Sequence, residues 1–104
     1  MKKHTQLFLD TSEINTAKIA VEFDGSRFEK SSESRVLKSQ MVLPLTEALL
    51  SEHNLKLSDV TEITVVTGPG SFTGLRVGAT VANALGYLLN ILVNGKKALA
   101  IPSY

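Results

Sequence analysis

The chain has 104 residues, of which 43% are hydrophobic and 20% charged, and its formal net charge is +1. This length predicts one domain with a modest core, and the composition indicates neither disorder nor a polyanion-binding surface. The absence of cysteine excludes a disulfide framework, a thiolate nucleophile and cysteine-ligated zinc.

The first third of the chain predicts three strands. Thr5 to Asp10 is typical of a buried strand that ends in an acidic residue, and its apolar stretch is too short for a signal peptide or a membrane span. We therefore expect a cytoplasmic protein. In residues 17–23 apolar and polar side chains alternate, which predicts a second strand. Asp24-Gly25 is a strong hairpin signal, and residues 26–31 return as a polar strand at the edge of the sheet.

Residues 36–53 show the period of an amphipathic helix. Pro44 should bend this helix near Gln40, unless the helix begins at Ser39 or later. Asn54 can end it in a left-handed conformation. Residues 61–67, β-branched throughout their centre, predict the fourth strand.

A second helix is predicted from Phe72 to about Leu89. One narrow stripe of it is polar, consisting of Arg76, Thr80, Asn83, Tyr87 and Asn90. Gly78, Ala82 and Gly86 recur every four residues and form a smooth groove along another side. This groove either packs on the chain's own sheet or makes a dedicated contact with another helix, and the sequence leaves both alternatives open.

Asn94-Gly95 lies between two apolar runs and predicts a hairpin near the end of the chain. We expect a fifth strand before this turn, parallel to the first and fourth strands. A sixth strand should then turn back beside it and cover the edge of the sheet.

The segment from Thr67 to Gly78 joins the fourth strand to the second helix. Its glycines allow positive φ and close backbone approach, and Ser71 or Thr73 can cap the helix, so free amides could face an anion or a partner's carboxylate. The glycine spacing is one residue longer than the dinucleotide fingerprint, and no P-loop lysine follows. A tight turn that only lets the helix pack on the sheet explains the pattern equally well.

The string Gly-Pro-Gly-Ser-Phe-Thr-Gly-Leu-Arg-Val-Gly at residues 68–78 resembles the bacterial TsaB (YeaZ) family, as do Leu9-Asp-Thr-Ser12 and Leu57-Ser-Asp-Val60. Members of this family are accessory proteins for threonylcarbamoyl-adenosine formation on tRNA, and the resemblance covers roughly residues 5 to 93. It implies a single α/β lobe of the actin-like ATPase (ribonuclease H-like) fold. We expect a mixed sheet of five or six strands in the order 3-2-1-4-5, with two main helices. Residues 1–104 would form the family's N-terminal domain, without its second domain.

The resemblance also implies a non-catalytic scaffold. The expected partners are the TsaD-like catalytic subunit of the threonylcarbamoyl transferase complex and its TsaE-like ATPase subunit, with a homodimer when the chain is alone. Contact with tRNA would be only indirect, and no cofactor is expected. Our candidate partner-binding residues are Met41, Leu45, Arg76, Gly78, Ala79, Ala82, Leu85 and Gly86. Two alternatives are a nucleotide-binding half-site completed by another chain and a structural remnant that only self-associates.

Few residues support chemistry. Asp10 lies at a strand end, where actin-like ATPases place a phosphate-and-metal loop, yet a carboxylate that accepts amides of its own turn is the favoured interpretation. Ser71 has no nearby histidine to activate it, and His4 and His53 lack the spacing of metal ligands. We therefore expect no enzymatic activity. Candidate anion- or nucleotide-binding loops comprise Asp10, Thr11, Ser12, Gly68, Gly70, Ser71, Thr73 and Gly74.

Overall fold

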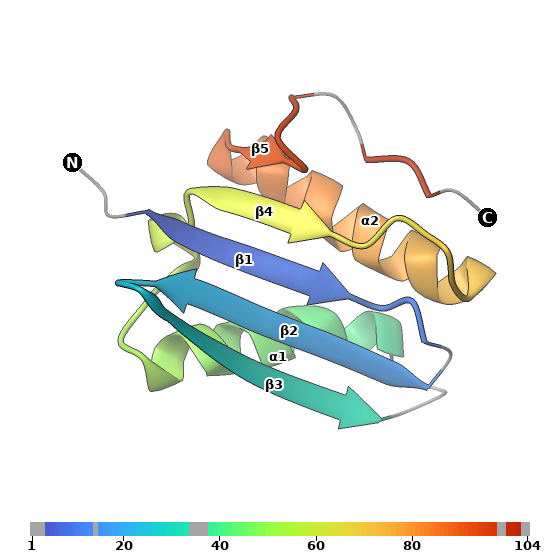
Figure 1. Ribbon diagram of the computed structural model, residues 1–104, viewed down its shortest axis with the longest axis horizontal. Coiled ribbons are helices and arrows are strands. Elements are labelled where there is room, and N and C mark those ends of the chain that lie inside the picture. Colours follow the sequence, from blue (N-terminus) through green and yellow to red (C-terminus); the bar gives the residue numbers. More distant parts are fainter. Residues whose placement is uncertain (1–3, 14, 34–37, 98–99, 103–104) are drawn as a thin grey trace.

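The computed structural model describes residues 4–13, 15–33, 38–97 and 100–102. It is a five-stranded sheet in the order β3-β2-β1-β4-β5 with two main helices (Figure 1). The elements are β1 (Thr5–Asp10), β2 (Thr16–Phe23), β3 (Ser26–Glu33), α1 (Lys38–Glu52), a 3-10 helix η1 (Leu57–Asp59), β4 (Glu62–Val65), α2 (Phe72–Leu89) and β5 (Leu92–Val93).

The strand order and directions predicted from the sequence are confirmed. β1 pairs antiparallel with β2 and parallel with β4, and β5 is parallel to β4. β4 is shorter than the predicted strand 61–67, because the chain leaves the sheet after Val65 to enter the glycine turn. β3 is longer than predicted and reaches Glu33, since β2 offers it a partner as far back as Thr16.

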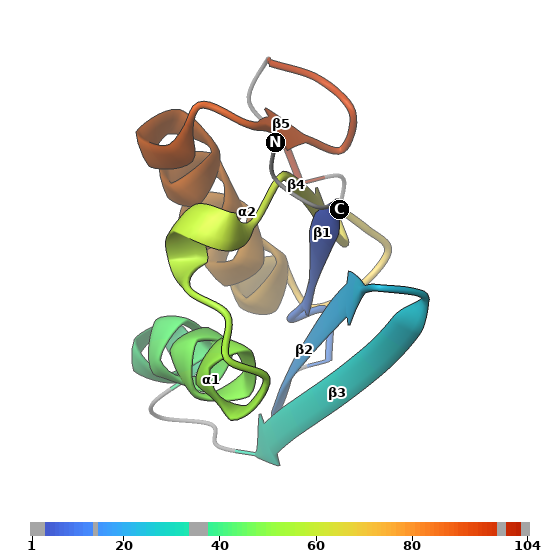
Figure 2. The same ribbon diagram turned by 90° about the vertical axis from the view of Figure 1, so that its left-hand side faces the viewer.

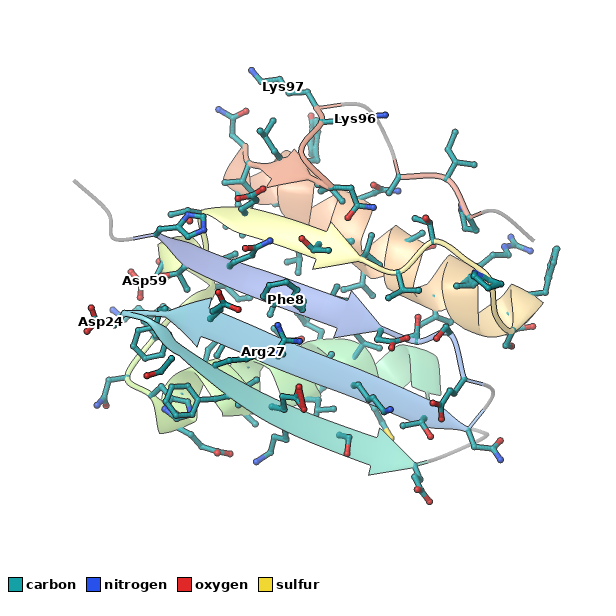
Figure 3. The ribbon with its side chains drawn as sticks, viewed as in Figure 1. Phe8, Asp24, Arg27, Asp59, Lys96 and Lys97 are labelled. Carbon is teal, nitrogen blue, oxygen red and sulfur yellow. The ribbon has the colours of Figure 1, made fainter. Side chains whose placement is uncertain are left out.

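Both helices cover one face of the sheet, and the opposite face is open (Figure 2). This arrangement follows from the alternation in β1, where Leu7 and Leu9 are buried beneath the helices and Gln6, Phe8 and Asp10 are half-buried on the other side. On the open face the Arg27 guanidinium lies 4.3 Å from the centre of the Phe8 ring (Figure 3). Within the described ranges, neither α1 nor α2 has the length and hydropathy that a membrane-spanning helix needs.

Two short turns use left-handed residues, as the sequence predicts. Asp24 and Gly25 have φ of 54° and 77°, and Asn94 and Gly95 have φ of 53° and 76°. Val93 and Lys96 exchange backbone hydrogen bonds of 3.0 and 3.1 Å across the second turn. The predicted turn at Asn94-Gly95 is therefore confirmed.

The predicted sixth strand is wrong for the residues that the structure describes. Beyond the bridge between Val93 and Lys96 the chain leaves the sheet, and residues 98–99 lie outside the described ranges. The Ala100 backbone instead exchanges two 2.9 Å hydrogen bonds with the Asn83 side chain of α2. The tail is held by the helix because Asn83 supplies both a donor and an acceptor.

In α1, Pro44 lies inside the helix, whose described part begins at Lys38. Residues 36 and 37 lie outside the described ranges. The buried Thr46 hydroxyl donates to the Val42 carbonyl at 2.7 Å. Asn54, with φ of 59°, ends this region in the left-handed conformation that was predicted.

Candidate functional site

The structure brings the two candidate loops, residues 10–12 and 68–74, into direct contact. Ser71 N donates to the Ser12 carbonyl at 2.7 Å, and Thr11 Oγ1 donates to the Gly74 carbonyl at 2.6 Å. Asp10 Oδ1 accepts hydrogen bonds from Ser12 N at 3.0 Å and Ser12 Oγ at 2.6 Å. The carboxylate therefore orders its own turn, which was one of the two alternatives for Asp10.

Ser71 is the N-cap of α2. Its hydroxyl accepts from Gly74 N at 3.3 Å, and its carbonyl accepts from Leu75 N at 2.8 Å. Thr73, the other predicted cap, is instead an exposed residue in the first turn. The amides of residues 71, 74 and 75 are thus bonded within the chain and are not available to an anion. Anion binding at these loops stays a prediction.

The glycines of the turn mainly allow the two loops to lie close to each other. Among the turn's glycines only Gly68 has a positive φ, 153°, so the positive φ that the sequence allows at Gly70 and Gly74 is not used there. A Cβ on Gly70 would lie 2.7 Å from both the Cβ and the carbonyl oxygen of Ser12. A Cβ on Gly78 would overlap Thr11 Oγ1 and approach a Val65 methyl to 3.3 Å. Steric contact with the first loop explains glycine at both positions.

The small-residue groove of α2 faces the chain's own sheet. Ala82 is 0% exposed, and a Cβ on Gly86 would overlap a Val93 methyl. Five of the candidate partner-binding residues are buried on this side of α2 and are not accessible in the chain on its own: Gly78, Ala79, Ala82, Leu85 and Gly86. The alternative that this groove packs on the sheet is the correct one.

The opposite side of α2, together with the neighbouring side of α1, presents apolar residues to solvent. Leu88 is 74% exposed and Leu43 38%, while Phe72, 55% exposed, lies on the neighbouring flank of α2 beside Arg76. This outer face also includes the exposed Ala84 and two half-buried side chains, Val77 and Val81, whereas Met41 and Leu45 lie on the side of α1 toward β3, where Ser32 Oγ donates to the Met41 sulfur at 3.7 Å. A hollow of about 340 Å³ on it is lined by Thr73, Arg76, Val77, Thr80 and Val81. Of the predicted partner-binding residues, Met41, Leu45 and Arg76 remain accessible, with the Arg76 guanidinium 5.7 Å from the centre of the exposed Phe72 ring.

One cluster was missed by the sequence analysis. The His53 ring stacks on Phe28 with 3.8 Å between centroids and meets Phe23 edge-on at 6.0 Å. The antiparallel register of β2 and β3 brings the two phenylalanines together, but no sequence signal places His53 above them. Among the described residues, no three His, Asp or Glu side chains gather in a group that could hold a metal ion.

Residues 32–99 match the family model described as TsaD, tRNA N6-adenosine threonylcarbamoyltransferase. The chain is 32% identical over 87 residues to the tRNA threonylcarbamoyladenosine biosynthesis protein TsaB of Haemophilus influenzae, a match that covers 84% of this chain and 36% of that protein. It is 53% identical over 51 residues to the tRNA N6-adenosine threonylcarbamoyltransferase of Chromobacterium violaceum, covering 49% of this chain and 15% of that one.

The solved structure of YeaZ from Pseudomonas aeruginosa superposes with a TM-score of 0.81 at 33% sequence identity. The superposition covers 86% of this chain and 42% of that one. The chain therefore spans well under half the length of the TsaB and YeaZ proteins that it matches. The likeness agrees with one lobe of an actin-like, ribonuclease H-like fold.

Proposed function

The chain belongs to the TsaB (YeaZ) family, and from this premise we propose that it is a non-catalytic partner subunit in tRNA N6-threonylcarbamoyladenosine modification. Its partner is the TsaD-like catalytic subunit of the threonylcarbamoyl transferase. The binding surface is the outer face of α1 and α2, as defined above.

The observation that carries this proposal is the exposed apolar surface of the outer face. Leu88, 74% exposed, is preceded along α2 by Ala84, Val81 and Val77 at steps of four, three and four residues. Residues three, four and seven apart share one side of a helix, so these side chains form one continuous strip. Contiguous exposed apolar surface on a small domain usually marks a protein interface.

The absence of catalysis is supported by the way the candidate loops are used. The Asp10 carboxylate accepts two hydrogen bonds from Ser12, and the cap of α2 uses its hydroxyl on the helix itself. These groups stabilise the contact between two loops of one lobe. A role as a scaffold requires nothing more of them.

The identity of the partner rests on the names of the relatives. The H. influenzae relative is named for threonylcarbamoyladenosine biosynthesis on tRNA, and the C. violaceum relative is a threonylcarbamoyltransferase. A subunit of the same lobe type presents comparable helices, so an apolar helix face on each protein can bury the other. The same face would pair two copies of this chain in the absence of the catalytic subunit, and a TsaE-like ATPase would join the assembled pair.

Ala84→Glu is expected to weaken association with the catalytic subunit by about tenfold or more, because Ala84 lies at the centre of the strip and a buried unpaired carboxylate is costly. Ala84 is exposed in the free chain, so the variant should fold with an unchanged melting temperature. Binding is measured by pull-down and by titration with the purified catalytic subunit.

The matched control is Ser31→Glu, which adds the same charge at an exposed position of β3, away from both helices' outer surface. It should bind as the unchanged chain does. Equal binding by the Ala84→Glu and unchanged chains would show that the outer face is not the interface.

A second candidate function is a nucleotide-binding half-site completed by a partner chain. It is favoured by the 53% identity to a transferase over about half of this chain. Under this alternative the assembled pair binds ATP through Asp10, whereas under the scaffold role Asp10→Ala leaves nucleotide binding by the pair unchanged.

A further inference from the structure

The polar stripe of α2 has one end that the outer face does not use. Near the C-terminus of the helix, the stripe borders a hollow of about 540 Å³ between α2 and the terminal hairpin. The hollow is lined by Asn83, Gly86, Tyr87, Leu88, Asn90, Ile91, Val93, Lys96 and Lys97. Residues from the last turns of α2 and from the turn that follows β5 thus meet around one depression.

The charge in this hollow is of one sign. Lys96 and Lys97 extend outward from the hairpin (Figure 3), and no acidic side chain is among the residues that line the hollow. The helix C-terminus would oppose an anion through its free carbonyls. Here Asn90 N donates to the carbonyls of Gly86 and Tyr87, and Ile91 N donates to the Gly86 carbonyl. These hydrogen bonds reduce the repulsion between the helix C-terminus and an anion.

Tyr87 adds a flat aromatic surface to the same place. Its side chain is 87% exposed, an unusual state for a ring this large, and it shares the hollow with the two lysines. Lysines that pair with phosphates beside an aromatic ring that stacks on a base are the elements of single-stranded nucleic acid binding. Tyr87 and Lys96 are nine residues apart in the sequence, and the turn after β5 brings the aromatic ring and the lysines to one hollow.

We propose that this hollow binds an unpaired stretch of RNA, with Tyr87 stacked on a base and Lys96 and Lys97 on adjacent phosphates. Because it assigns direct RNA contact to this chain, the inference rests on the proposed role in tRNA modification and revises the expectation of only indirect contact. The site lies on the flank of α2 that Asn83 shares with the tail, and it meets the outer face at Leu88, which also lines the hollow. Tyr87, Lys96 and Lys97 lie off the outer face, so RNA and the catalytic subunit can bind together.

The test is fluorescence anisotropy of a short labelled single-stranded RNA titrated with the full chain at several salt concentrations. Lys96→Ala combined with Lys97→Ala should weaken binding by about tenfold at low salt. It should also reduce the slope of log affinity against log salt by about 1.4, since each phosphate contact on a single strand contributes about 0.7. Tyr87→Ala should weaken binding by about tenfold, and Tyr87→Phe should retain it, because stacking needs only the ring.

The matched control is Lys18→Ala combined with Lys56→Ala, which removes the same charge from exposed positions elsewhere. If this control weakens binding as much as the hairpin pair does, the attraction is only that of net charge and the proposed site is wrong. Equal affinity for fully paired RNA, or no RNA binding by the unchanged chain, would also overturn it.

The same variants separate this inference from the proposed function. The hairpin variant should still associate with the catalytic subunit, because its substitutions leave the outer face intact. Loss of association through Ala84→Glu with RNA binding retained would confirm that the two surfaces are independent. If the unchanged chain binds RNA but not the catalytic subunit, the proposed function fails and the RNA site stands.

Discussion

Gly78→Val is expected to lower the free energy of unfolding by about 3 kcal/mol, at the upper end of the cost of overpacking a core. A side chain at this position would overlap Thr11 Oγ1, which donates a 2.6 Å hydrogen bond to the Gly74 carbonyl, and would crowd Val65 on β4. The helix cannot move away without breaking that buried hydrogen bond. For a domain of this size we expect a fall in melting temperature of about 15 °C.

The matched control is Ala84→Val, which places the same side chain at an exposed position of the same helix. It should cost about 0.5 kcal/mol through helix propensity alone. Thermal and urea unfolding followed by circular dichroism measure both variants. Similar stability losses in the two would mean that α2 does not pack on the first loop as closely as the structure has it.

Gly70→Val is expected to cost about 2 kcal/mol for a different reason. The added Cβ would lie 2.7 Å from the Ser12 carbonyl oxygen, so the backbone of one loop must shift. That shift would lengthen the 2.7 Å hydrogen bond from Ser71 N to the same oxygen. The two candidate loops would then separate.

A comparison with Gly25 tests whether the stability loss at Gly70 comes from steric overlap or from backbone strain. Gly25 has φ of 77° and open space around its Cβ position, so Asn, which tolerates the left-handed region, should be better there than Ala. At Gly70 the reverse order is expected, because Asn is larger and space is the limit. A preference for Asn over Ala at Gly70, seen in the melting temperatures, would contradict the steric account.

The arrangement of the sheet could be predicted because its signals are local. Asp24-Gly25 sets the antiparallel pairing of β2 and β3, and long helical crossovers place β4 and β5 parallel to β1. Two-residue turns and helix periods depend on neighbouring residues in the chain. They can therefore be recognised without knowledge of the tertiary structure.

The direction of the small-residue groove could not be predicted from the same sequence. Gly78, Ala82 and Gly86 fit a sheet or another helix equally well, since both require close backbone approach. What decides between them is the position of Thr11, in the loop after β1, and of Val93, on β5, which lie against Gly78 and Gly86. Because the groove is buried on the sheet, the apolar surface that α2 presents to solvent lies on another side of the helix.

The end of the chain shows a similar limit. The Asn94-Gly95 turn was predicted correctly, but the strand after it was not, because Asn83 binds the Ala100 backbone. A side-chain amide that replaces a strand partner leaves no periodic pattern in the sequence. The same folding back of the hairpin brings Lys96 and Lys97 beside Tyr87, a combination that their sequence positions conceal.

Hydrogen–deuterium exchange of the chain, with and without the catalytic subunit, tests the central claim most directly, because it maps the contact surface without any substitution. Binding through the outer face predicts slower exchange in α1 and α2 and unchanged exchange in β3 and the turn at Asp24-Gly25. Slowed exchange confined to β2 and β3, with α1 and α2 unaffected, would contradict the account.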